Sequence, residues 1–209
     1  MKIDITSVSR KAERAGDAAA AIFVISRDDI RRSGMASIPD LLRTVPGLNV
    51  AQVNSNKWAV SVRGFNNVFA NKLLVLIDGR SVYNQIFSAV LWDTEDVPLD
   101  DIERIEVIRG PAAAMWGANA VNGVINIVTL AADKTLGGAA RVDAGRLGAQ
   151  GAVRYGGTLG GASYRLYSQW TARERAVIAP GTPANDASHL WTSGFRADWT
   201  TAPGALTFD

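Results

Sequence analysis

The first part of the chain, up to Leu130, alternates between strand-like and helix-like patterns. Residues 22–26 form an apolar, β-branched run that predicts a strand. Ser26, followed by two acidic residues and stopped by Ser33-Gly34, predicts a short helix, because a serine side chain can cap the first turn. A second short helix is expected from Ser37, which resembles the start of a capping box, to Pro46-Gly47.

Further strands are predicted from period-two alternation and from continuous apolar runs. Residues 48–53 and 58–62 alternate around a polar turn, and residues 73–77 form an apolar run that Asp78-Gly79 stops. Residues 102–108 alternate again, and residues 124–128 close the region. Short helices mixed with these strands predict a small α+β domain with a mixed sheet.

Beyond Ala131 the helix signals end, and alternating segments separated by Gly-rich turns take over. Their lengths, about 9 to 13 residues, suit tilted strands that cross a bilayer. In residues 162–173, Tyr164, Leu166 and Trp170 share one face, whereas Arg165 and Gln169 lie on the other. This alternation is expected where lipid lies on one side and a wet lumen on the other, as in antiparallel transmembrane β-barrel strands.

A soluble β-sandwich or meander also alternates apolar and polar positions, so the pattern alone leaves both architectures open. The turns at 147–148 and 160–161 are short, whereas residues 180–186 form a long polar excursion. Long loops at one end and short turns at the other favour the outer-membrane barrel.

Composition narrows the possible functions. The 209 residues have 47% hydrophobic content and a formal net charge of +2, which does not indicate a nucleic-acid-binding protein. The absence of cysteine excludes disulfides, thiolate zinc sites and thiol catalysis. The single histidine, His189, has no cluster of ligands or catalytic partners around it in the sequence. We therefore expect no enzyme activity, no bound cofactor and no metal held directly by the protein.

Neither a secretory signal nor a membrane helix is apparent. The first residues lack a charged segment followed by an apolar one and a small-residue cleavage site, so a signal would have been removed or would precede this chain. The uncharged run 110–132 contains Pro111, three glycines and three asparagines, which makes it a poor spanning helix.

Six short motifs occur in a fixed order in the first part of the chain, and each alone would be a weak signal. They are Ile25–Arg31, Ile38–Leu48, Val62–Phe65, Leu76–Arg80, Ile102–Pro111 and Trp116–Ile127. Together they resemble the plug domain of TonB-dependent outer-membrane receptors. The resemblance covers about half of the chain and leads directly into the barrel-like strands.

The resemblance implies three regions. Residues 1–20 would be an N-terminal tether with a TonB-box-like segment, 21–130 the plug, and 131–209 the first strands of an incomplete outer-membrane β-barrel. Barrels of plugged transporters close at about 22 strands, so the strands present here would leave open edges and would form no pore by themselves.

The resemblance also implies a function, a location and partners. The chain would be part of an outer-membrane receptor, with its plug in the barrel lumen and its N-terminus in the periplasm, that imports a metal chelate with energy supplied through TonB. A ferric siderophore is expected ahead of cobalamin. The alternatives are a stand-alone periplasmic plug-like module that binds or signals without transport, and a fragment that does not transport.

The resemblance implies a role for two arginines, each of which ends an apolar strand and precedes a glycine. Arg63 and Arg109 match motif positions whose arginines pair with glutamates on the inner barrel wall, and this implies a lock that holds the plug in the lumen. Ordinary surface arginines at strand ends are the alternative.

Two loops are expected to face the ligand, because the corresponding plug loops of the family face the outside. Flat aromatic rings and amide groups suit an organic chelate, although part of these aromatics could simply pack the loops. The candidate ligand-binding residues are Asn54, Ser55, Asn56, Lys57, Trp58, Tyr83, Asn84, Gln85, Phe87 and Trp92.

The N-terminus should carry the extended segment that TonB captures by strand addition. One stretch of β character precedes the plug and loosely resembles such a box. It consists of Ile3, Asp4, Ile5, Thr6, Ser7 and Val8.

Overall fold

The computed structural model describes residues 4–5, 13–14, 21–95, 97–178, 181–201 and 204–209. The chain divides into two compact units. The first comprises Met1–Val53 and Lys57–Thr129, and the second comprises Asn54–Asn56 and Leu130–Asp209.

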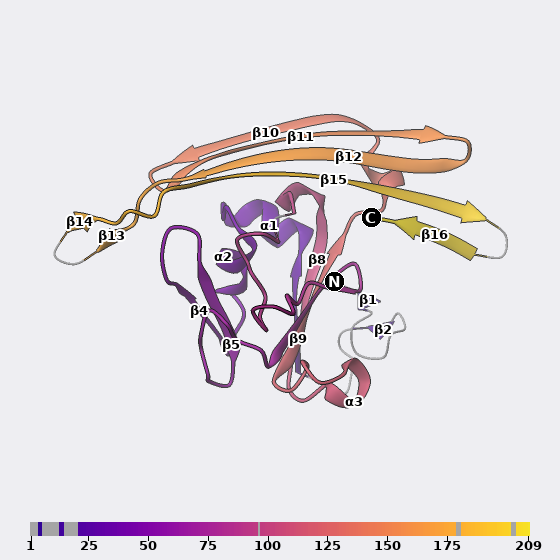
Figure 1. Ribbon diagram of the computed structural model, residues 1–209. Coiled ribbons are helices and arrows are strands. Elements are labelled where there is room, and N and C mark those ends of the chain that lie inside the picture. Colours follow the sequence, from indigo (N-terminus) through magenta and orange to yellow (C-terminus); the bar gives the residue numbers. More distant parts are fainter. Residues whose placement is uncertain (1–3, 6–12, 15–20, 96, 179–180, 202–203) are drawn as a thin grey trace. The chain divides into compact units, whose positions relative to one another are not determined.

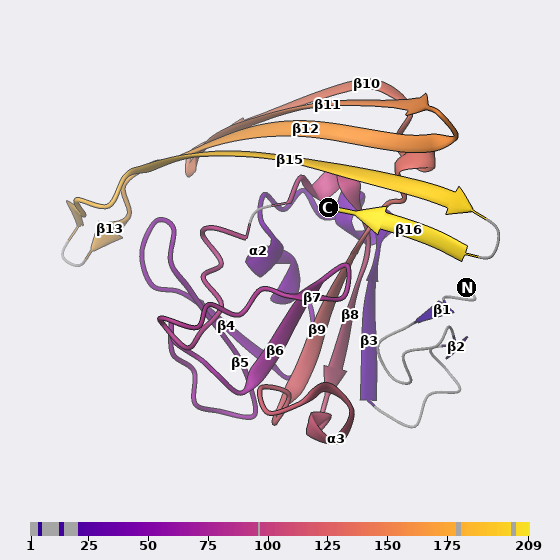
Figure 2. The same ribbon diagram turned by 45° about the vertical axis from the view of Figure 1, so that its right-hand side comes forward.

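The first unit is built on a five-stranded mixed sheet with the order β3-β8-β9-β6-β7 (Figure 2). Strands β6 and β9 pair in parallel, and the other neighbours are antiparallel. The strands are β3 (Ala21–Ser26), β6 (Leu73–Ile77), β7 (Arg80–Ser81), β8 (Ile102–Arg109) and β9 (Gly123–Thr129). This arrangement confirms the predicted mixed sheet.

The first unit also contains two separate pairs of strands. Strands β4 (Leu48–Gln52) and β5 (Trp58–Val62) pair antiparallel and form a two-stranded sheet of their own. Strand β1 (Asp4–Ile5) pairs with β2 (Glu13–Arg14). Because β5 has no ladder to the main sheet, its position depends on packing and on individual hydrogen bonds.

The helices of the first unit are short and begin where the sequence predicts. Helix α1 (Arg27–Ser33) has a complete capping box: the Ser26 hydroxyl accepts from the Asp29 amide at 3.2 Å, and the Ser26 amide donates to the Asp29 carboxylate at 2.9 Å. Ser37 caps helix α2 (Ile38–Leu42). The remaining elements are the turns η1 (Leu99–Asp101) and α3 (Ala113–Trp116).

Both faces of the main sheet are covered by apolar side chains. Ile105, Val107 and Ile125 belong to the larger cluster, which also contains Leu41 and Leu42 of α2. Leu74, Leu76, Ile108 and Val124 belong to a smaller cluster on the alternate positions. The sheet is therefore a central layer, as its nearly continuous apolar strands indicate.

The second unit is an antiparallel meander with the order β10-β11-β12-β15-β16 (Figure 1). Its strands are β10 (Gly137–Gly145), β11 (Gly148–Leu159), β12 (Ala162–Arg173), β15 (Ser188–Thr201) and β16 (Gly204–Phe208). A small hairpin of β13 (Val177–Ile178) and β14 (Thr182–Pro183) lies in the excursion between β12 and β15. Within the described residues β10 and β16 each pair on one side only, so the sheet is not closed.

The faces of this meander are sorted as predicted. Leu166 and Phe195 face each other across β12 and β15 and are 52% exposed each, whereas Arg165 is only 3% exposed. Arg165 donates to the Leu130 carbonyl at 2.8 Å, and Asp198 accepts from the Ala132 amide at 2.6 Å. These two bonds hold the turn η2 (Ala132–Thr135) against the polar face.

The uncharged run 110–132 is not a long helix, because it forms α3 and β9 instead. No helix in the described ranges combines the length and apolar character needed to cross a membrane.

Candidate ligand site

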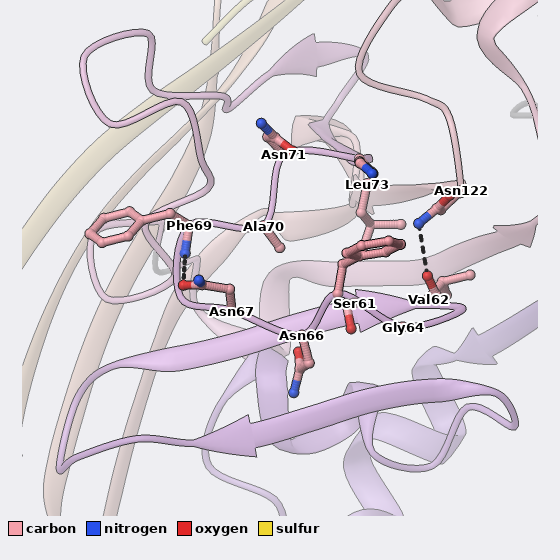
Figure 3. Close-up of a pocket in the computed structure, with 12 residues that line it drawn as sticks. Ser61, Val62, Gly64, Asn66, Asn67, Phe69, Ala70, Asn71, Leu73 and Asn122 are labelled. Atoms are coloured by element: carbon pink, nitrogen blue, oxygen red, sulfur yellow. Dashed lines mark hydrogen bonds between the residues drawn. The ribbon is translucent and has the colours of Figure 1, made fainter.

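A pocket of about 280 Å³ lies in the first unit beneath the loop that joins β5 to β6 (Figure 3). The loop runs from Gly64 to Lys72 and is rich in asparagine and phenylalanine. The pocket is lined by Ser61, Val62, Gly64, Phe65, Asn66, Asn67, Phe69, Ala70, Asn71, Lys72, Leu73 and Asn122. The sequence did not lead us to predict this loop as a site, although its two rings and three amides within seven residues were a compositional signal.

The loop begins with a strained turn. Arg63, Gly64 and Phe65 have φ values of +59°, +91° and +56°, so three consecutive residues are left-handed. Glycine adopts this region freely, whereas each of the two other residues costs roughly 1–2 kcal/mol. Such a conformation persists only where the surrounding structure holds it.

Specific contacts hold this turn and the rest of the loop. The Lys72 ammonium lies 4.0 Å from the centroid of the Phe65 ring, a cation–π contact. The Asn122 side chain donates to the Val62 carbonyl at 3.0 Å (Figure 3), and its backbone amide donates to the Lys72 carbonyl at 2.9 Å. Asn67 accepts from the Phe69 amide at 3.1 Å and shapes the tip of the loop.

Two polar atoms of the pocket wall are buried. The Ser61 hydroxyl and the Asn66 side-chain oxygen are both inaccessible and make no hydrogen bond within the part of the chain that the structure describes. The Asn66 amide nitrogen is engaged, because it donates to the Asn49 side-chain oxygen at 3.2 Å. Both residues line the pocket, so its wall carries polar groups beside the aromatic rings.

The predicted ligand loop 83–92 contacts the wall of this pocket through a pair of stacked aromatic rings. Phe87 is half-exposed and stacks on Phe69, with ring centroids 6.1 Å apart and an interplanar angle of 18°. The Asn84 side chain accepts from the amides of Ile86 and Phe87 at 3.0 and 3.1 Å, which fixes the loop. Tyr83 is half-buried and Gln85 exposed. The two loops thus offer one aromatic and amide surface.

Two of the expected ligand aromatics belong to the core instead. Trp58 is 6% exposed and Trp92 is 8% exposed, and both pack in the main cluster. The Arg43 guanidinium covers the Trp58 ring at 5.1 Å from its centroid. Neither indole offers a surface to a ligand.

The predicted ligand residues of the turn 54–57 differ in exposure. Lys57 is exposed, and the Asn54 side chain accepts from the Asn56 amide at 3.1 Å. Ser55 is buried in the second unit, where its amide donates to the Asp186 carboxylate at 2.8 Å and its hydroxyl donates to the Asp186 carbonyl. The Ser55 hydroxyl is therefore engaged.

The two arginines of the expected lock differ in their surroundings. Arg63 is exposed, and it makes no ion pair within the described ranges. The Arg109 guanidinium donates through Nη1 to the Pro46 carbonyl at 2.8 Å, whereas its Nε is buried and has no partner among the described residues. Arg109 thus fixes the turn after α2 and keeps a donor that a carboxylate could satisfy.

Of the proposed TonB box, Asp4 and Ile5 lie in strand β1. Ile3, Thr6, Ser7 and Val8 lie outside the described residues.

Three other carboxyl groups of the first unit are buried or hydrogen-bonded within it. Glu106 is fully buried and pairs with Arg104 at 2.7 Å. Burial raises the pKa of Glu95, and Arg80 partly opposes the rise. Hydrogen bonds from Ser26 hold the pKa of Asp29 below its usual value. Among the described residues no three His, Asp or Glu side chains gather as a metal site.

The sequence matches one family of known proteins. The family model of the TonB-dependent receptor plug domain matches residues 14–124. The vitamin B12 transporter BtuB of Vibrio vulnificus is 32% identical over 143 residues, which are 68% of this chain and 23% of that protein. The ferric enterobactin receptor PirA of Pseudomonas aeruginosa is 33% identical over 132 residues, which are 56% of this chain and 17% of that protein.

Solved structures agree. The siderophore receptor PirA from Pseudomonas aeruginosa superposes with a TM-score of 0.62 and 26% identity, over 90% of this chain and 34% of that one. The Pseudomonas aeruginosa protein FpvA, bound to heterologous pyoverdines, has a TM-score of 0.69 at 17% identity and shares the fold. It matches 98% of this chain and 26% of that one. The chain spans less than a third of the length of the curated relatives described here.

Proposed function

Because the chain belongs to the TonB-dependent receptors, we propose that it forms part of an outer-membrane receptor that imports a metal chelate, most of all a ferric siderophore. The receptors and transporters it matches also confirm that it is not an enzyme. The observation that carries the proposal is the joined surface of the loops 64–72 and 83–90, where Phe69 stacks on Phe87 beside a pocket rich in amides.

The chemistry of this surface suits a chelator rather than a bare ion. Aromatic rings and amides contact flat organic groups and their carbonyl or hydroxyl substituents. Iron in a hard-ligand site would need carboxylates or imidazoles, and the described residues gather none. Affinity should therefore depend on the organic part of the chelate.

Within such a receptor the regions take the roles that the family implies. Residues 21–130 act as the plug that gates the lumen, residues 131–209 contribute the first strands of the barrel in outer-membrane lipid, and the N-terminal segment 3–8 binds periplasmic TonB. The long meander supports this arrangement over a stand-alone periplasmic module, which would not need strands of 12 and 14 residues with an exposed apolar face.

Arg63 and Arg109 form the contacts of the plug with the barrel wall. The planar guanidinium of Arg109 supports this role, because its fork can hold a carboxylate beside the contact with the Pro46 carbonyl. Glutamates on later strands would supply those carboxylates.

A cobalamin receptor is the second candidate. The similarity to a vitamin B12 transporter of Vibrio vulnificus favours it, since that relative covers 68% of the chain. Corrin side-chain amides could use the same asparagines. The two candidates differ in the ligand and share the surface.

The test is a titration of the complete receptor with ferric catecholate and hydroxamate siderophores, cobalamin and an iron salt. A ferric siderophore should bind, and Phe87→Ala should raise its Kd about tenfold by removing a stacked aromatic contact. Ile86→Ala is the matched control, because this neighbouring side chain is 86% exposed. Binding of cobalamin alone would assign the second candidate, and binding of the bare salt would contradict both.

A further inference from the structure

We infer that Asn122 is a positioning residue that ties the left-handed turn at Arg63 to the end of β8 at Arg109 and Gly110. The inference rests on the proposed role of these arginines at the barrel wall. Asn122 lies directly before β9 and forms part of the pocket floor. Within the described ranges it makes no hydrogen bond to either arginine side chain, and it acts through the backbone next to each of them.

Three hydrogen bonds meet at this residue. Its side-chain Nδ2 donates to the carbonyl of Val62, the residue before Arg63, at 3.0 Å. Its carbonyl accepts from the amide of Gly110, the residue after Arg109, at 2.9 Å. Its amide donates to the Lys72 carbonyl at 2.9 Å. One residue therefore joins the end of β5, the end of β8 and the start of β6.

The side-chain bond matters most, because the other two connections follow the main sheet. Strand β5 pairs with β4 and has no ladder to the five-stranded sheet. The side-chain amide of Asn122 thus supplies a directional link from β5 to β9. Apolar packing alone would let the two strands slide past each other.

The backbone at residues 122–123 is held in place, so the short side chain of Asn122 has a defined position. At the next residue, Gly123, an added Cβ would collide with the Ile108 carbonyl, which shows how closely this segment approaches β8. An amide held this way can support the left-handed run at Arg63, Gly64 and Phe65 from one end. The Lys72 ammonium over the Phe65 ring supports it from the other end.

The first measurement is the backbone order of the turn, from amide relaxation of the 209-residue chain in detergent. Asn122→Ala should lower the order parameters of Gly64 and Phe65 from about 0.85 toward 0.6, while those of Val75 in β6 stay unchanged. Asn71→Ala is the matched control, since Asn71 lines the same pocket and makes no described bond to either turn. Unchanged order in Asn122→Ala, or an equal loss in Asn71→Ala, would overturn the inference.

The second measurement is transport by the complete receptor. Measured at a saturating chelate concentration, Asn122→Ala should reduce uptake about fivefold, the effect of losing one hydrogen bond of ordinary strength. Adding Arg63→Ala should lower uptake no further than Arg63→Ala alone, because both changes act on one contact. Full additivity would contradict the inference. Normal uptake in Arg63→Ala would instead reject the proposed lock, and the relaxation experiment would still decide the role of Asn122.

Discussion

Arg109 makes one hydrogen bond within the first unit and keeps further donors on the same guanidinium. Its Nη1 donates to the Pro46 carbonyl, and its buried Nε faces no partner in the described part of the chain. A lysine would keep the charge but would lose the planar fork that allows two bonds at once.

We therefore expect Arg109→Lys to lower the free energy of unfolding of the first unit by about 1 kcal/mol, the net worth of one hydrogen bond. Arg63→Lys should change it by less than about 0.5 kcal/mol, as is usual for an exposed position. Urea unfolding followed by fluorescence of the buried tryptophans measures both. Equal effects would contradict the contact with Pro46 as a stabilising one.

Glu95 gives a second prediction at the residue scale. Burial raises the pKa of Glu95 above its ordinary value, so the carboxyl ionises less readily in the folded chain than in the unfolded one, and it destabilises the fold as the pH rises above that ordinary value. Glu95→Gln should therefore stabilise the chain at pH 7 and have little effect near pH 4. Unfolding curves at both pH values test this, and a larger gain at pH 4 would show the opposite sign.

Single-residue roles were the hardest to predict from the sequence. Tyr83, Gln85 and Phe87 remain accessible, whereas Trp58 and Trp92 lie in the core. An aromatic residue near a loop has the same local pattern in both cases, and only long-range packing decides its burial.

At the scale of elements, the chain pattern predicted more. The helix starts at Ser26 and Ser37 follow from local capping, and the mixed sheet follows from apolar runs. The alternation of β12 correctly placed Leu166 and Arg165 on opposite faces. Leu166 is exposed, whereas Arg165, which we expected to face a wet lumen, is buried. These features depend on residues close together in the sequence, so the local pattern is enough to predict them.

The loop 64–72 escaped prediction for the complementary reason. It has no periodicity, and its left-handed turn at Arg63, Gly64 and Phe65 is held by distant residues such as Asn122. The contact between Phe69 and Phe87 joins residues 18 positions apart in loops without regular structure. Such a surface is visible only once β5 and β6 are packed.

For the whole receptor, the N-terminal segment makes the energy coupling testable. Ile5 lies in the short strand β1, within the proposed TonB box. Strand addition needs backbone donors, so Ile5→Pro should abolish uptake while leaving chelate binding at the cell surface within about twofold. Ile5→Val is the conservative control. Loss of binding as well would indicate that the segment is structural.

The two units also differ in how far they can stand alone. The first has its own core, with Leu41, Leu42, Ile105 and Ile125 all at most 1% exposed. The second exposes Val142, Trp191 and other large apolar side chains, and its sheet edges at β10 and β16 lack partners within the described residues.

We therefore expect residues 21–130 to fold in water without the rest of the chain, and residues 131–209 to aggregate unless detergent covers their apolar face. Amide hydrogen exchange of the isolated 21–130 segment should show protected amides in β6, β8 and β9. Leu42→Ala should destabilise it by about 2–5 kcal/mol, because it leaves a cavity in a fully buried site. Uniformly fast exchange in the unmodified segment would show that the core needs the barrel strands to form, and the plug would then be a dependent part of the receptor.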